Sequence, residues 1–171
     1  MSEEAYFDLQ SAFVETKGKP IVLNGCEIVQ GDWLPLDGPA VVEVRMLSET
    51  VRPHDHVRLS FKKKGRIGLS DGSWVRTLEV RDHETLPRWV RHKVEPKGEA
   101  LLVSNAYTVV RGKAEFTESW TGNAGLIVRE KLSHYRRYDC SNGRGEFNKN
   151  DLSFEVTLLP ADTAWLPEEI Y

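Results

Sequence analysis

Three side chains that could carry acid–base chemistry stand close together in the sequence: Glu130, His134 and Arg136. They belong to residues 125–140, GLIVREKLSHYRRYDC, whose pattern predicts one long strand. Because side chains two apart on a strand point to the same face, all three share a face with apolar residues such as Leu126. In an apolar setting they would serve as acid, base and carboxylate anchor. We therefore predict Glu130 and His134 as catalytic residues and Arg136 as a ligand-binding residue.

A β-bulge within this strand would change which of these side chains face the interior. A bulge inserts one extra residue, so the inward and outward faces exchange beyond it. Glu130 would then lie outside the protein. The sequence leaves this alternative open.

Neighbouring strands supply aromatic and amide groups that would complete a pocket. Ligand pockets are mostly apolar, with a small number of polar groups that orient the ligand. The further ligand-binding residues that we predict are Tyr107, Asn105, Trp74, Trp120 and Tyr138.

The pattern His54-Asp55-His56 places two imidazoles on the same side of a strand. It is similar to the His-x-His of the cupin family, but Ser60 and Phe61 stand where that motif continues with Glu. A metal needs at least three protein ligands to be held well. We predict no metal site and an exposed position for both histidines. A metal-dependent β-barrel enzyme that uses His54 and His56 is the alternative.

Composition limits the classes of function. The 171 residues fit one domain, 1–171, and the net charge of -3 argues against a nucleic-acid partner. The cationic run at 62–66 is expected to be a solvated turn, with a phosphate contact as the alternative.

Cys26 and Cys140 are expected to be free thiols. No stretch reaches the roughly 18 apolar residues of a membrane span, and the N-terminus lacks a signal-peptide pattern, so we expect a cytoplasmic protein.

The elements that must position these residues are mostly strands. A helix is expected at 3–15, where Tyr6, Leu9 and Phe13 share a face and Ser2 would be the N-cap. Asn24-Gly25 and Asp71-Gly72 are hairpin signals, and 31–39 is expected to be a loop. Strands are expected at 21–23, 26–29, 41–47, 54–62, 67–69, 74–80, 88–94, 99–110, 115–120, 126–139 and 152–159, with an irregular tail at 160–171.

This spacing predicts an all-β fold, a single antiparallel β-barrel of about 8–10 strands with a short N-terminal helix. With one helix and a strand meander, the chain resembles the calycin (lipocalin-like) architecture. Gly31-Asp32-Trp33 has the Gly-x-Trp spacing of that superfamily but follows a hairpin, so the resemblance is one of architecture. The resemblance implies a lumen that holds one small molecule.

Two classes of function follow from this reading. The first is a small-molecule-binding barrel, either a binder or a cofactor-independent cyclase, isomerase or lyase; no cofactor is expected. The second is a protein-interaction module, such as an immunity or assembly protein, which binds through a strand edge or the 141–151 loop. Whether the protein is an enzyme and whether it forms a homodimer are left open. A closed cavity around Glu130 or His134 would favour the first class, and a solid core with both in solvent would favour the second.

Overall fold

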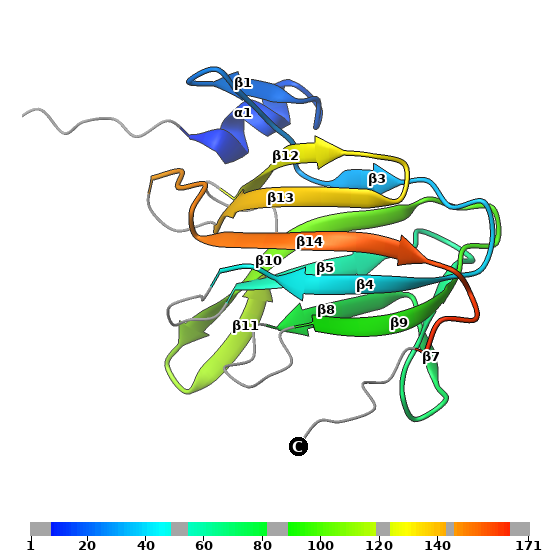
Figure 1. The fold of residues 1–171 in the computed structure, drawn as a ribbon. Helices are drawn as coiled ribbons and strands as arrows, with labels where there is room; N and C mark the ends of the chain where they lie inside the picture. The colour runs from blue at the N-terminus through cyan, green and yellow to red at the C-terminus, as the bar shows by residue number, and fades with distance from the viewer. Residues whose placement is uncertain (1–7, 49–54, 82–88, 119–123, 143–145, 165–171) are drawn as a thin grey trace, which may run out of the picture.

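The computed structural model describes residues 8–48, 55–81, 89–118, 124–142 and 146–164. Strands dominate these residues, so the all-β prediction is confirmed. Two antiparallel sheets of seven and five strands pack face to face, and a two-stranded hairpin lies beside them (Figure 1).

The seven-stranded sheet has, in order, the strands β12 (Gly125–Lys131), β13 (Tyr135–Ser141), β14 (Leu152–Leu159), β4 (Ala40–Met46), β9 (Trp89–Glu95), β6 (Arg66–Gly68) and β7 (Trp74–Val75). The five-stranded sheet contains β11 (Ala114–Glu118), β10 (Leu101–Arg111), β5 (Asp55–Ser60) and β8 (Thr77–Arg81), with β3 (Asp32–Leu34) also paired to β10. Every pairing within the two sheets is antiparallel.

The chain crosses between the two sheets at both sides of the molecule. β7 and β8 are separated only by Arg76, whose carbonyl accepts from the Phe61 amide at 2.9 Å, yet they belong to different sheets. At the other side, Val29 bridges Leu126 of β12, and the chain then runs into β3 on the five-stranded sheet. No sheet closes on itself within the described ranges, so the expected single calycin-like barrel is not confirmed.

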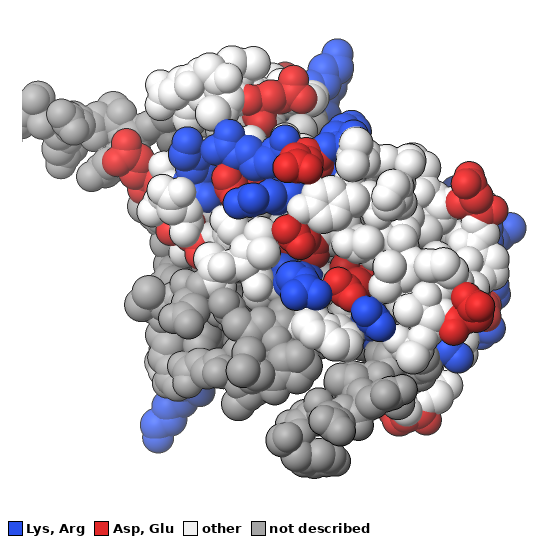
Figure 2. All heavy atoms as spheres, viewed as in Figure 1, with Lys and Arg blue, Asp and Glu red and all other residues white. Residues whose placement is uncertain are grey.

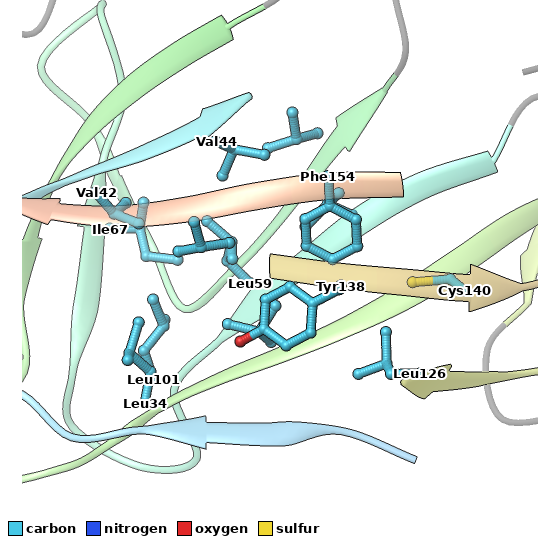
Figure 3. Packing of buried hydrophobic residues seen from close by; sticks show 14 of the residues in the cluster. Leu34, Val42, Val44, Leu59, Ile67, Leu101, Leu126, Tyr138, Cys140 and Phe154 are labelled. Atoms are coloured by element: carbon cyan, nitrogen blue, oxygen red, sulfur yellow. The ribbon is translucent and has the colours of Figure 1, made fainter. Parts of the chain in front are cut away.

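Apolar side chains from both sheets fill the space between them. Val42, Val44 and Met46 point inward from β4, as their alternation predicts. The rings of Tyr138 and Phe154 stack in the middle of this core, with centroids 4.9 Å apart (Figure 3). The buried core is therefore a packed layer of side chains between the two sheets.

A second, smaller cluster lies at the β12 edge. The helix α1 (Leu9–Glu15) and the hairpin of β1 (Ile21–Leu23) and β2 (Cys26–Ile28) pack on Ile127 of β12. The hairpin turn at Asn24-Gly25 has positive φ at both residues, as predicted. Cys26 and Cys140 form no disulfide in the described structure; Cys140 is buried in the main core, and Cys26 is half-buried against the small cluster.

The predicted helix at 3–15 is confirmed only from Leu9 onward, because residues 1–7 lie outside the described part. Its N-cap is Asp8, whose side chain accepts from the Ser11 amide at 3.1 Å, and not Ser2. No helix in the described residues is both long enough and apolar enough to cross a bilayer.

Replacing Gly125 with Ala should loosen the contact between the small cluster and β12. A Cβ there would lie 2.6 Å from Cγ2 of Ile28 and 3.3 Å from Cδ2 of Leu9. We expect the free energy of unfolding to fall by about 1–3 kcal/mol, the usual cost of overpacking, in urea titrations. Gly38→Ala is the control, because a Cβ at Gly38 would meet nothing within 4 Å. Equal midpoints for the two variants would contradict the tight contact at Gly125.

Candidate functional site

Residues 125–140 form a hairpin, so the prediction of one long strand is wrong. β12 ends at Lys131 and β13 begins at Tyr135. The turn closes where the Leu132 amide donates to the Tyr135 carbonyl at 2.9 Å. Residues 132–134 include no Gly, Pro, Asn or Asp, the residues that most strongly mark a turn in a sequence.

A β-bulge at Arg129 decides which face Glu130 takes. The pairing of β12 with β13 shifts register between Val128 and Glu130, which leaves Arg129 as the extra residue. Arg129 turns to Asp139, with Nε 2.7 Å from the carboxylate. Beyond the bulge, Glu130 lies opposite Arg137 and is exposed, as the bulge alternative anticipates.

The predicted inward grouping of Glu130, His134 and Arg136 is therefore wrong. His134 lies in the exposed turn, and its carbonyl accepts from the Leu158 amide. Of the three side chains, only Arg136 is buried. The two residues predicted to be catalytic are thus outside the protein, and the predicted ligand-binding arginine is inside.

Arg136 and Tyr138 meet Asp32 in the interior, and we call these three side chains the Asp32 cluster. Nη1 of Arg136 donates to Oδ2 of Asp32 at 3.0 Å, and the Tyr138 hydroxyl donates to the same oxygen at 2.7 Å. Nε of Arg136 donates to the Leu132 carbonyl at 2.8 Å. All three side chains are buried. Because Asp32 is on β3 and its partners are on β13, the cluster joins the two sheets.

The Asp32 cluster is chemically satisfied by its own members. Burial raises the pKa of Tyr138 far above its ordinary value, and the Asp32 charge and hydrogen bond raise it further. The hydroxyl therefore stays protonated and donates. The guanidinium and the carboxylate neutralise one another, which is the condition under which buried charges persist. The cluster is thus a buried connection between the two sheets.

Sequence reasoning misses Asp32, because residues 31–39 read as a loop rich in Gly, Pro and Asp. The structure has the short strand β3 there, with Asp32 and Leu34 buried and Trp33 exposed. The alternation of Asp32, Trp33 and Leu34 is the sequence signal for this strand, and it puts Asp32 on the same face as Leu34.

The other predicted pocket residues are divided among different places. Asn105 and Tyr107 are buried on the same face of β10, and Nδ2 of Asn105 donates to the Ser141 carbonyl at 2.7 Å. Trp74 is partly exposed on β7, at the far end of the seven-stranded sheet from β12, with the Arg66 guanidinium 4.1 Å from its ring. Trp120 lies outside the described residues.

His56 is buried on the outer face of β5, although the sequence predicts it to be exposed. Its Nδ1 lies 3.4 Å from Oε2 of Glu79, and Nε of Arg58 donates to Oε1 of the same carboxylate at 2.6 Å. Burial alone would raise the pKa of Glu79, but the contacts with His56 and Arg58 outweigh it and hold the pKa below its ordinary value. His54 lies outside the described residues, and those residues include no group of three or more potential metal ligands.

The cationic turn at 62–66 binds an internal carboxylate. The backbone amides of Lys63, Lys64 and Gly65 donate to Glu99 at 2.8, 2.6 and 2.5 Å. These bonds, that of Gly65 foremost, lower the pKa of Glu99. Successive amides of this kind are the groups that bind phosphate in anion-binding loops. Here they are occupied by a residue of the protein itself.

The outer face of the seven-stranded sheet carries charged side chains in register. Glu130 lies opposite Arg137, Arg137 opposite Glu155, and Glu155 opposite Arg45. We call these four residues the charge row. Its signs alternate across β12, β13, β14 and β4. Figure 2 shows the same face, where blue and red side chains alternate over these strands.

Hydrogen bonds and ion pairs hold the side chains around the charge row. The Tyr135 hydroxyl donates to Glu155 at 2.8 Å. Glu43 is bound between Arg91, at 2.8 Å, and Arg45, at 3.5 Å. The guanidinium of Arg91 also donates to the carbonyl of Ala164 in the tail at 2.9 Å. Two members of the charge row, Glu155 and Arg45, therefore have partners on the same face.

Comparison with known proteins finds no protein-family model, no curated protein and no solved structure that matches this chain.

Asp32→Asn should strongly destabilise the fold, because it leaves the Arg136 guanidinium buried without its counter-charge. Breaking one partner of a buried pair typically costs about 3–5 kcal/mol, which urea titration would measure. The exposed Asp37→Asn is the control. The double variant Asp32→Asn/Arg136→Leu has no charged side chain left in the cluster and should recover part of the loss. If Asp32→Asn and Asp37→Asn unfold at the same midpoint, the cluster does not hold the sheets together.

Glu79 should make the fold sensitive to acid. Its folded pKa lies below the unfolded value, so the unfolded chain binds the proton more readily. The stabilisation is present above the unfolded pKa, about 4.3 for Glu, and is lost as the pH falls through the folded pKa. The stability difference between wild type and Glu79→Gln should therefore shrink as the pH falls from about 5 to 3. Glu15→Gln, at an exposed position, is the control. A pH-independent difference for Glu79→Gln would refute this linkage.

Proposed function

We propose that this protein is a protein-interaction module without catalytic activity, and that it binds its partner on the outer face of the seven-stranded sheet. The observation that carries the proposal is the charge row, which runs across four neighbouring strands. Glu130, Arg137 and Arg45 are exposed, and Glu155 is half-buried.

The interior supports a binding role more than a catalytic one. Acid–base catalysis needs a carboxylate or imidazole beside the reacting atoms of a substrate. Glu130 and His134 are exposed on the hairpin, and the ionised groups of the Asp32 cluster are committed to each other. The core between the sheets is filled with apolar side chains such as Phe154 and Leu59.

A face with alternating charges is well suited to recognise another protein. Neighbouring strands lie about 4.8 Å apart, so the charge row presents alternating charges at regular intervals over about 14 Å. Complementary charges steer association and fix the register of the partner, while like charges reject other proteins. Tyr135 binds Glu155 and Glu43 binds Arg45, and these contacts reduce the entropy that the two side chains lose on binding. This fits the class of immunity and assembly proteins.

Small-molecule binding is the second candidate, and Asn105 favours it. Its Oδ1 is buried and accepts no hydrogen bond from the described residues. An unsatisfied buried acceptor costs about 1–3 kcal/mol, which a bound donor would offset. This candidate requires a calycin-like lumen near Asn105 and Tyr107, both of which are buried, as are Arg136 and Tyr138.

The test of the first candidate reverses two charges of the charge row. Arg45→Glu/Arg137→Glu should weaken binding of a partner protein at least about tenfold, or about 1.4 kcal/mol, because two attractive contacts become repulsive. Tagged wild type would capture the partner, and calorimetry with the purified partner would give the affinity. The matched control, Lys97→Glu/Lys113→Glu, changes the net charge equally at exposed positions elsewhere.

Equal affinity of the two double variants for the partner would contradict a role for this face. A small molecule found by native mass spectrometry in the wild type, and lost in Asn105→Leu, would instead favour the second candidate.

A further inference from the structure

We infer that the partner on this face is a second copy of the chain, in a two-fold dimer whose axis runs parallel to β13 and β14 and passes between them. The inference rests on the proposed function, since it names the occupant of the same face. It follows from the order of the charges in the charge row.

When a second charge row is laid over the first in reverse order, each charge meets a charge of opposite sign. A two-fold axis parallel to the strands keeps each position along the strands but reverses the order of strands. Glu130 then faces Arg45 of the second copy, and Arg137 faces Glu155 of the second copy. By symmetry the other two members are matched as well, so each of the four charges meets an opposite charge.

Only this direction of the axis gives a match. An axis along the charge row, across the strands, would place Glu130 on Glu130 and Arg137 on Arg137 of the second copy. Like charges that face each other across an interface cost several kcal/mol. The charges themselves therefore select the orientation.

The positions of β13 and β14 beside the charge row are compatible with the same arrangement. Asp139 of β13 lies opposite Ser153 of β14, and Tyr135 lies opposite Thr157. Under the same axis, Asp139 faces Ser153 of the second copy and Tyr135 faces Thr157. Neither contact joins like charges, and hydroxyl groups can donate to a carboxylate.

The dimer should be weak and sensitive to salt. Exposed ion pairs contribute about 0–1 kcal/mol each and are screened within about 8 Å at physiological ionic strength. The contacts between Arg137 and Glu155 lie closest to the axis, so they should dominate. Because these contacts should contribute most to association, Arg137 and Glu155 are the best residues for a charge-swap test.

The experiment is sedimentation analysis of the full chain at about 20 mM and about 500 mM salt, on either side of physiological screening. The wild type should self-associate at low salt and dissociate at high salt. Arg137→Glu alone should be at least about tenfold weaker, because the new carboxylate faces Glu155 of its copy. Glu155→Arg alone should be equally weak, because its guanidinium faces Arg137.

The decisive sample is an equal mixture of the two variants. In a mixed dimer of Arg137→Glu with Glu155→Arg, every facing pair is again opposite in charge, so the mixture should associate as tightly as the wild type. Lys113→Glu, an exposed site on the β10–β11 turn, is the control and should behave like the wild type. If Glu155→Arg fails to fold by circular dichroism, Arg45→Glu mixed with Glu130→Arg tests the outer pair by the same logic.

A wild type that stays monomeric at low salt overturns the inference, and so does a mixture that stays monomeric while the wild type associates. Self-association that neither single variant weakens overturns it as well. A wild type that is monomeric can still capture a different protein that Arg45→Glu/Arg137→Glu no longer binds. In that case the proposed function stands, and only the inference that the partner is a second copy is wrong.

Discussion

The hydrogen bonds from Arg136 and Tyr138 to Asp32 are the contact on which both surfaces of the β12–β13 hairpin depend. They fix two residues of β13 toward the interior, and Arg136 also binds the carbonyl of Leu132 in the turn. Since neighbouring residues of a strand point to opposite faces, holding positions 136 and 138 inward forces position 137 outward. The buried cluster thus determines the charge that the sheet presents to solvent.

The bulge at Arg129 completes this arrangement from the neighbouring strand. If Arg129 were paired as in a regular strand, Glu130 would lie two positions beyond Val128 on the same face and would point into the apolar core. A carboxylate there would need a counter-charge, and the buried guanidinium of Arg136 is already bound to Asp32. The bulge moves Glu130 to the outer face, where it stands opposite Arg137.

The sequence predicts those parts of the fold that depend on local pattern. The inward set of β4 and the turn at Asn24-Gly25 are confirmed, because alternation and positive φ are encoded by neighbouring residues. The turn at 132–134 and the bulge at Arg129 contain no Gly, Pro, Asn or Asp. The sequence therefore predicts one long strand there. The partner of Arg136 is 104 residues away in the chain, and no spacing rule connects Asp32 with it. Sequence alone therefore does not bring the three residues together, although strand alternation predicts a shared face for Arg136 and Tyr138, and both are buried.

The small cluster of α1, β1 and β2 has a consequence for assembly. β12 ends the seven-stranded sheet, and an uncovered end strand offers its backbone to any extended chain. Here Val29 takes both hydrogen bonds of Leu126, at 2.9 and 2.8 Å, and the helix packs over Ile127. The backbone of Leu126 is therefore already paired within the chain, which opposes the addition of a further strand at this end of β12.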